Sequence, residues 1–157
     1  MQIRAYRPNQ DYRAVLEAQC DLYQINFPRF QCSPAFLADQ AHRLRTVARR
    51  PFEQGIFMLI DGDVLAGFIW VSIRMDLQGP FGSVDQVYLW PDYRQKGLGG
   101  QLLEAAHEFL RKQGVDLARL YVTSNNAVAV RLYERYGYRI TRYEMERVEG
   151  KHGEEQH

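Results

Sequence analysis

The sequence lacks the features that mark several classes of protein. Only two cysteines, Cys20 and Cys32, occur among 157 residues, which supports neither a disulfide framework nor a cysteine-based zinc site. The four histidines form no spaced ligand set with them, so we expect no bound metal. We expect Cys20 to be an ordinary half-buried helix residue, because free cysteines are commonly buried.

A dominant charge and a long apolar run are also missing. The formal net charge is +1, which gives no global field to attract nucleic acid or an anionic membrane. No apolar run approaches the roughly 20 residues of a membrane-spanning helix. The start, MQIRAYRPNQ, has no apolar signal segment, so we expect a cytoplasmic protein. Hydrophobic content of 46% and charged content of 25% are ordinary for a globular domain.

Helix and strand patterns interleave along the chain. Asn9 is predicted to cap a first helix, in which apolar residues recur at helical spacing. A second helix should begin where Ser33, as N-cap, precedes Pro34. Asp61-Gly62-Asp63 joins two β-rich runs and predicts a hairpin. Strands are predicted at 3–7, 55–60, 64–75, 83–90, 118–124 and 138–148. Helices are predicted at 9–23, from 34 until Pro51 ends the helix, at 98–113 and at 126–136. We therefore expect one mixed α/β domain over residues 1–149 and a polar tail at 150–157.

Three glycines lie close together in one turn of the sequence. Residues 91–110, PDYRQKGLGGQLLEAAHEFL, place Gly97, Gly99 and Gly100 at the start of a predicted helix, where each costs roughly 1 kcal/mol relative to alanine. A glycine-rich turn that leads into a helix exposes backbone N–H groups at the positive end of the helix dipole, which suits phosphate. Arg94 and Lys96 add positive charge. The alternative is a tight turn with solvated cations.

The type of phosphate site can be narrowed by spacing. The glycines match neither a P-loop nor a dinucleotide-binding fingerprint. They match R-x-x-G-x-G over residues 94–99, directly after VYLWPDY. This resembles the pyrophosphate loop of the GCN5-related N-acetyltransferases (GNAT family), which bind acetyl-coenzyme A. One helix and one strand later, NAVAVRLYERYGY at 126–138 resembles the family's second signature, N-x-x-A-x-x-L-Y-x-x-x-G-[FY].

The resemblance implies a fold and an activity. The fold is a twisted mixed sheet of about six to seven strands with helices on both faces. The activity is acetyl-CoA-dependent N-acetyl transfer, in which a primary amine of a small molecule, peptide or protein attacks the thioester directly. The resemblance leaves open whether the protein forms a homodimer. One alternative is a catalytically silent acyl-coenzyme A sensor, and another is an unrelated nucleotide-binding domain whose turn mimics the motif. The presence of Tyr133 favours the enzyme.

The resemblance also implies roles for single residues. In the family, the strand before the loop splays from its neighbour at a bulge, and its free backbone groups bind the pantetheine arm. This carries over to Val87 and Leu89, with the Leu89 N–H as oxyanion donor. Tyr133 matches the general acid and Asp85 a position that often holds the base, although many relatives lack an acid there and use water chains. Otherwise Tyr133 is a packing residue and Asp85 a strand anchor. The expected cofactor-binding residues are Val87, Tyr88, Leu89, Arg94, Gln95, Lys96, Gly97, Leu98, Gly99, Gly100, Asn126, Ala129 and Tyr133.

The acceptor side is less defined by the sequence. In the family, the first two helices, the loop between them and the last strands form the acceptor pocket. Here the loop carries Phe27 and Phe30, and the last predicted strand carries Tyr143. Scattered acids, Asp21 among them, can anchor a cationic amine or simply belong to the surface. Polyamine, amino acid, aminoglycoside and peptide N-terminus all stay open as acceptors.

Overall fold

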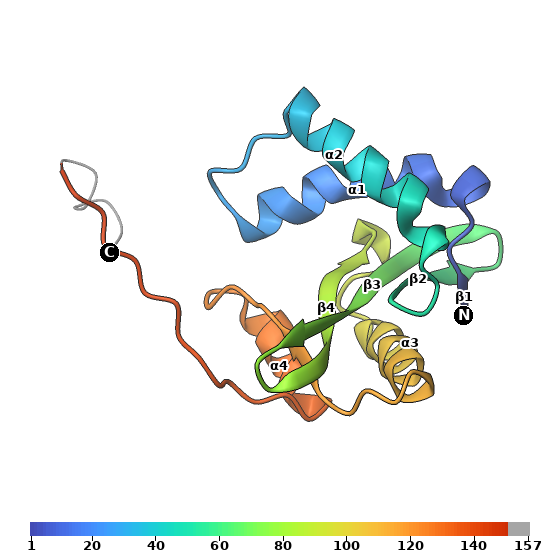
Figure 1. Cartoon of the computed structure of the whole chain (residues 1–157). Coiled ribbons are helices and arrows are strands. Elements are labelled where there is room, and N and C mark those ends of the chain that lie inside the picture. Colours follow the sequence, from blue (N-terminus) through green and yellow to red (C-terminus); the bar gives the residue numbers. More distant parts are fainter. Residues whose placement is uncertain (151–157) are drawn as a thin grey trace.

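The computed structural model describes residues 1–150 and folds them around a mixed sheet with helices on both faces (Figure 1). Strands β1 (Gln2–Ala5), β2 (Gln54–Asp61), β3 (Val64–Asp76) and β4 (Gly79–Leu89) pair antiparallel in that order, and β5 (Ala118–Leu120) lies parallel to β4. The mixed sheet confirms the predicted fold class. Within residues 1–150 the sheet has five strands, fewer than the expected number of about six to seven.

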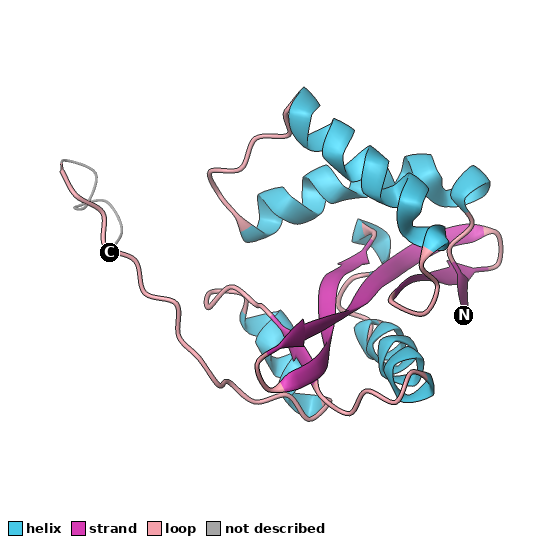
Figure 2. Ribbon diagram, viewed as in Figure 1, coloured by secondary structure: helices cyan, strands magenta, loops and turns pink. Residues whose placement is uncertain are grey.

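The helices divide between the two faces of the sheet (Figure 2). Helices α1 (Pro8–Asn26) and α2 (Pro34–Thr46) share a buried cluster with Phe68 of β3. Helix α3 (Gly99–Lys112) packs on the opposite face around Ile69, and α4 (Ala127–Arg135) lies beside it. Phe68 and Ile69 are adjacent, so the alternation of side chains along one strand supplies both cores. No helix within residues 1–150 has both the length and the apolar character needed to span a membrane.

Local signals set several element boundaries. The Ser33 hydroxyl accepts a hydrogen bond from the Phe36 N–H at 3.1 Å, which confirms Ser33 as the N-cap of α2. The β2–β3 hairpin turns at Gly62, whose φ of 61° suits glycine. Helix α1 begins at Pro8, so the cap predicted at Asn9 is wrong; proline fits the first turn because no N–H is needed there. Short 3-10 turns occur at Val47–Arg49 and Pro91–Tyr93.

The strand predicted at 138–148 is absent from the described structure. Residues 139–150 instead run away from the body as an extended arm beyond α4 (Figure 1). Strand β5 is also shorter than predicted and ends at Leu120. A strand requires a neighbour for its backbone groups, and the arm has none within residues 1–150 of the same chain. Apart from Gly150, the predicted polar tail lies outside the described residues.

The two cysteines are paired, contrary to the sequence prediction. Cys20 in α1 and Cys32 just before α2 form a disulfide, with their Cα atoms 5.5 Å apart. The antiparallel arrangement of the two helices brings the cysteines together, and neither their number nor their spacing reveals that arrangement. The disulfide closes a loop that contains Phe30, and the ring of Phe30 packs against Phe36 of α2 with their centroids 4.7 Å apart. It therefore restrains the loop predicted to carry the acceptor pocket.

Helix α4 lies close to the first turn of α3 because two glycines leave room for it. A Cβ atom at Gly99 would lie 2.7 Å from Leu132 Cδ2, and one at Gly100 would collide with the ring and hydroxyl of Tyr136. Gly97 differs, since open space surrounds it and its φ is 73°. Gly97 is thus required by its left-handed backbone conformation, whereas Gly99 and Gly100 are required because helix α4 approaches closely.

We expect Gly100→Ala to destabilise the protein by about 1–3 kcal/mol, because the methyl group forces α4 away from α3. Urea denaturation measures the change in the free energy of unfolding. The double variant with Tyr136→Phe should lose less than the sum of the two single variants, since the hydroxyl that meets the methyl is gone. Gln101→Ala on the same turn is the control and should shift stability by about 0.5 kcal/mol at most. Additive effects in the double variant would contradict this packing.

Candidate functional site

The end of β4 carries backbone groups that the sheet leaves free. β4 pairs with β5 only through residues Gly82 to Val84, but continues along β3 to Leu89. The Trp90 N–H donates to the Ala66 carbonyl of β3 at 3.0 Å. Successive N–H groups of an extended strand point to opposite sides, so those of Val87 and Leu89 point away from β3, into the space that β5 leaves open. This is the splay predicted from the family resemblance.

A bulge in β4 lies at the start of the splay. Trp70 faces Gln86 while Val71 faces Val84, which leaves Asp85 as the extra residue. The Asp85 carboxylate accepts hydrogen bonds from Arg74 at 2.7 Å, from the Ser72 hydroxyl at 2.6 Å and from the Ser83 hydroxyl at 2.6 Å. All three donors belong to β3 and β4. These contacts hold the bulge, and they engage both carboxylate oxygens of the predicted base.

The glycine turn follows directly after β4. Gln95 and Gly97 both adopt left-handed backbone conformations, with φ of 58° and 73°. The turn leads into α3, whose flanking Leu98 gives no side-chain cap and whose first turn has no acidic residue. The first N–H groups of any helix have no partner inside the helix. The positive end of α3 is therefore available to an anion, in agreement with the predicted phosphate site.

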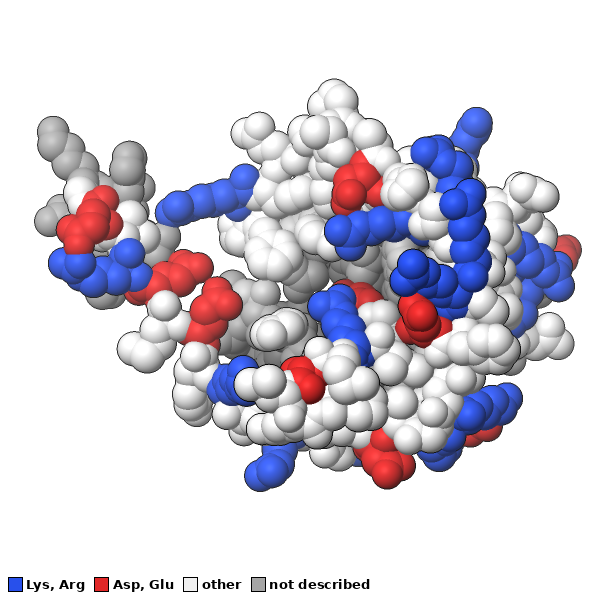
Figure 3. Space-filling model, viewed as in Figure 1, with Lys and Arg blue, Asp and Glu red and all other residues white. Residues whose placement is uncertain are grey.

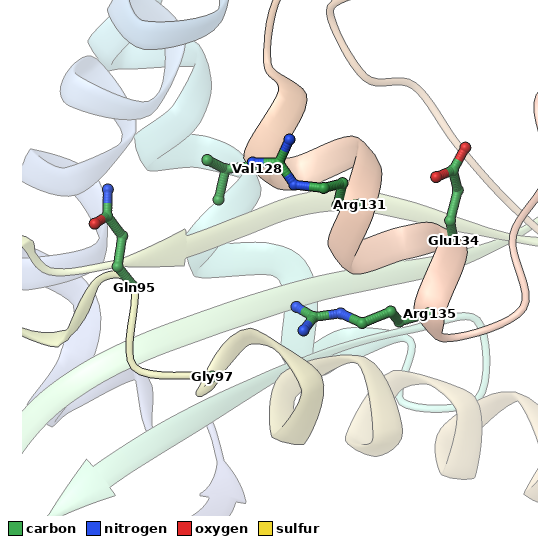
Figure 4. Close-up of a pocket in the computed structure, with 6 residues that line it drawn as sticks. All are labelled: Gln95, Gly97, Val128, Arg131, Glu134 and Arg135. Carbon is green, nitrogen blue, oxygen red and sulfur yellow. The ribbon is translucent and has the colours of Figure 1, made fainter.

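A groove of about 640 Å³ separates this turn from α4 (Figure 4). Arg131 and Arg135 extend across it from α4 toward the turn that carries Gln95 and Gly97. Sequence analysis missed both arginines. Their i, i+4 spacing places them on one face of the helix, and this spacing is a signal that could have revealed them. The groove thus combines a helix N-terminus with two guanidinium groups.

Arg94, predicted at the rim of the phosphate site, has other partners. Its guanidinium donates to the Leu89 carbonyl at 2.8 Å and to Asp21 of α1 at 2.9 Å. Asp21 also accepts a hydrogen bond from the Tyr88 hydroxyl at 2.6 Å. This bond, and then the Arg94 contact, hold the pKa of Asp21 below its usual value against the opposing effect of burial. The structure therefore brings Asp21, one of the scattered acids considered for the acceptor amine, to the end of β4.

Tyr133 lies on the same side of the sheet as the splay. Its ring packs against the α3 cluster, as do the side chains of Val87 and Leu89. Burial raises the pKa of the Tyr133 hydroxyl above its ordinary value, so this group keeps its proton at neutral pH. The neighbouring Tyr138 has its hydroxyl 2.7 Å from His107 Nε2. Tyr133 is thus a protonated phenol on the face that carries the free strand edge.

The remaining predicted residues have varied surroundings. Asn126 caps α4, with its side-chain oxygen 3.2 Å from the Ala129 N–H. The Lys96 ammonium lies 5.9 Å from the centre of the Tyr93 ring rather than in the groove. Phe27 packs with Tyr23 at a centroid distance of 6.0 Å in the restrained α1–α2 loop.

Tyr143, the other aromatic expected at the acceptor pocket, does not join the site. It is 85% exposed on the arm. Within one chain, the structure does not bring it to the α1–α2 loop.

The chain matches a family model and several curated relatives. Residues 16–138 match the model of the Acetyltransferase (GNAT) family. A mycothiol acetyltransferase from Thermobispora bispora is 29% identical over 143 residues, which cover 88% of this chain and 46% of that protein. The chain spans less than half the length of the curated relatives that it matches, for example 25%, 46% and 44% of three mycothiol acetyltransferases.

Solved structures share the fold. The tetramutant of the BH1408 protein from Bacillus halodurans aligns with a TM-score of 0.81 at 18% identity, covering 94% of this chain and 99% of that one. AAC(6')-Iy, in complex with the bisubstrate analogue CoA-S-monomethyl-acetylneamine, aligns with a TM-score of 0.67 at 20% identity, covering 96% and 98%. At such identities these structures show the fold alone. The family model covers most of the sequence and includes both signatures, and the chain belongs to the GNAT family of acetyltransferases.

Proposed function

We propose that this protein is an acetyl-CoA-dependent N-acetyltransferase that acetylates a primary amine. The observation that carries the proposal is the meeting of three features at one end of β4. The Leu89 N–H points into the splay, a helix N-terminus follows within the same turn, and Tyr133 packs on the shared cluster. Acyl transfer needs an oxyanion donor, a phosphate site and a proton donor, and these three features supply them.

The groove fits the donor substrate chemically. The pyrophosphate of coenzyme A is anionic, and the turn offers backbone N–H groups at the positive end of α3. We assign Arg131 and Arg135 to the phosphates, since guanidinium groups bind phosphate oxygens in pairs. The free backbone groups of Val87 and the N–H of Leu89 suit the amides of the pantetheine arm, whereas the Leu89 carbonyl already accepts a hydrogen bond from Arg94. AAC(6')-Iy, which shares the fold, is described in complex with a coenzyme A analogue, and this agrees with the assignment.

Each step of the transfer then has a group to assist it. The Leu89 N–H donates to the oxyanion that develops when the amine attacks the thioester carbonyl. Tyr133 gives its proton to the leaving sulfur, and its raised pKa ensures that the proton is present at neutral pH. The attacking amine must first lose a proton, because an alkyl ammonium has a pKa near 10.4. The amine needs a base at this step, and Asp85 is the candidate.

Asp21 supports the acceptor side of the site. Its carboxylate lies beside the end of β4, and its side chain is 45% exposed, so a cationic amine can reach it. Phe27, 56% exposed, offers an apolar surface in the loop that directly follows the same helix. We therefore propose an acceptor that carries its amine on a partly apolar molecule. The cytoplasmic location stays a prediction from the sequence.

An acceptor screen tests the proposed function. Purified protein, acetyl-CoA and one amine from each class (polyamine, amino acid, aminoglycoside and peptide N-terminus) are combined, and the release of free thiol is followed. We expect turnover with at least one class, and heat stabilisation by coenzyme A but not by ATP or NAD. Stabilisation without turnover in any class would instead indicate a silent acyl-CoA sensor. No stabilisation by coenzyme A would refute the assignment altogether.

We expect Arg135→Gln to weaken acetyl-CoA binding about tenfold, because a charge-assisted contact to phosphate contributes about 1.5 kcal/mol or more. Isothermal titration gives the dissociation constant directly. Arg111→Gln is the matched control, since this arginine lies on α3 and pairs with Glu108 away from the groove. Equal affinities of Arg135→Gln and the unmodified protein would remove Arg135 from the phosphate site.

Tyr133→Phe should slow the chemical step about 100-fold, the usual range for loss of a general acid. Single-turnover measurement with saturating acetyl-CoA gives this rate, and the affinity for acetyl-CoA should stay within about threefold because the ring is kept. Tyr138→Phe removes the hydroxyl of a neighbouring tyrosine that contacts His107, and it should leave the rate nearly unchanged. Similar rates in both variants would show that Tyr133 only packs.

Asp85→Asn separates the two roles considered for Asp85. If the carboxylate removes the amine proton, the maximal rate should fall about tenfold or more at pH 7 and recover as pH rises toward the pKa of the amine. If the three hydrogen bonds only hold the bulge, the pH profile should match that of the unmodified protein, with a modest loss of stability. The maximal rate and the acceptor KM, measured from pH 6 to pH 10, distinguish these outcomes.

A further inference from the structure

The disulfide lies at the two ends of the loop between α1 and α2. Cys20 belongs to α1, and Cys32 directly precedes Ser33, the N-cap of α2. Both cysteines are half-buried, so the pair is not sealed inside the core. Figure 3 shows mainly uncharged side chains over this part of the surface, and Arg29 is the one charged residue among residues 22–38. The disulfide is therefore placed where a small thiol from solution can approach it.

Few backbone contacts hold this loop. The Phe30 N–H donates to the Phe27 carbonyl, and the Ser33 N–H donates to the Gln31 carbonyl, both at 2.9 Å. In the described part of the chain, no backbone group of residues 28–32 bonds to the backbone of a helix or strand. A segment with so few hydrogen bonds to its surroundings opens locally at a small cost in free energy.

Aromatic rings supply the other contacts of the loop. The Tyr23 ring of α1 packs against Phe30 at a centroid distance of 5.4 Å and against Phe36 of α2 at 5.0 Å. Such ring contacts at the surface can separate without the loss of a hydrogen bond. The covalent link between the two cysteines therefore decides how far the loop can open.

The helix that carries Cys20 also reaches the proposed active site. Asp21, the next residue, accepts hydrogen bonds from the Tyr88 hydroxyl at 2.6 Å and from Arg94 at 2.9 Å. At the end of α1, the Asn26 carbonyl accepts a hydrogen bond from the Thr123 hydroxyl at 3.2 Å. The segment closed by the disulfide thus touches both the end of β4 and the chain beyond β5.

We propose that Cys20 and Cys32 are a reversible redox site, whose disulfide orders the acceptor loop and whose reduction by a dithiol frees it. The consequence for the acceptor rests on the proposed N-acetyltransferase function. A loop that must become ordered on binding weakens the complex, and the disulfide removes this cost beforehand. The acetyl-CoA groove is lined by the glycine turn and α4, so the redox state leaves it unchanged.

The reduction proceeds as two thiol–disulfide exchanges. One thiolate of the dithiol attacks one cysteine sulfur and forms a mixed disulfide, while the S–S bond breaks and the other cysteine leaves as a thiolate. The second thiol of the reductant then attacks its own sulfur in the mixed disulfide, which closes a cyclic disulfide and releases the first cysteine. The protein gains two electrons and two protons, and the dithiol loses them. Oxidised dithiol reverses both exchanges, and the Cα separation of 5.5 Å allows the bond to form again in the ordered loop.

Thiol counting and trypsin sensitivity test the redox site. The protein is equilibrated at several ratios of oxidised to reduced dithiothreitol, and alkylation followed by mass measurement counts the free cysteines. In parallel samples, after removal of the dithiothreitol under nitrogen, cleavage after Arg29, which is exposed in the loop, is followed by mass. We expect both cysteines to become free together and this cleavage to be about tenfold faster in the reduced protein. Cleavage after Arg142, exposed on the C-terminal arm, is the internal control and should not change.

The double variant Cys20→Ser, Cys32→Ser is the matched control for reduction. It should be cleaved after Arg29 at the fast rate at every ratio of dithiothreitol, and isothermal titration should give an acetyl-CoA affinity equal to that of the unmodified protein. For an amine identified by the acceptor screen, mass spectrometry of the acetylated product gives the kinetics. Reduction of the unmodified protein should raise the KM for the amine about fivefold with the maximal rate little changed. The double variant should show the higher KM in both conditions.

Four results would overturn the proposal. Two free cysteines in oxidised dithiothreitol would mean that the bond does not form. A bond that resists dithiothreitol until the protein unfolds would be purely structural. Equal cleavage after Arg29 in both states would show that the disulfide does not control the loop, and an equal KM would show that the loop does not control the acceptor. If no amine is acetylated in either state, the proposed function fails, whereas the thiol count and the cleavage still decide the redox site.

Discussion

The site depends on how early β5 stops pairing with β4. Only residues Gly82 to Val84 of β4 have a partner on that side, and the strand then continues to Leu89 with β3 alone. Unpaired N–H groups are costly when buried, so such an edge persists only where something else can bond to it. β4 tolerates this state because β3 pairs with it to its end, and because the Asp85 hydrogen bonds hold the bulge where the strand bends. The free edge is therefore rigid, which suits a group that must meet a developing charge.

The second requirement is that α4 comes close to the end of this strand. Gly99 and Gly100 permit it, since side chains there would meet Leu132 and Tyr136. One helix then brings Tyr133 to the core beside Leu89 and sends Arg131 and Arg135 into the groove. The glycines of the turn thus act in two ways. Gly97 shapes the backbone of the turn, whereas Gly99 and Gly100 allow the approach of the helix that carries Tyr133, Arg131 and Arg135.

What the sequence predicted correctly depends on local physics. The cap at Ser33 and the hairpin at Gly62 each follow from one or two neighbouring residues. What the sequence did not predict depends on distant partners. Cys32 meets Cys20 only because two helices pack antiparallel, and Arg94 contacts Asp21 only because α1 passes over β4. The resemblance to the family predicted the free strand edge and the glycine turn. The two arginines of the groove could be recognised only once the position of α4 was known.

The prediction of a last strand at 138–148 was wrong because the sheet offers those residues no paired neighbour. Strand formation is a property of a pair, and residues 139–150 have the pattern of a strand but no neighbour in their own chain. Two edges of the sheet therefore stay open within residues 1–150. The β4 edge beyond Val84 is open because β5 stops pairing there, and the outer edge of β5 is open because no strand follows it in the sheet. The early end of β5 is the feature on which the proposed pantetheine site depends, since a longer β5 would occupy the N–H groups of Val87 and Leu89.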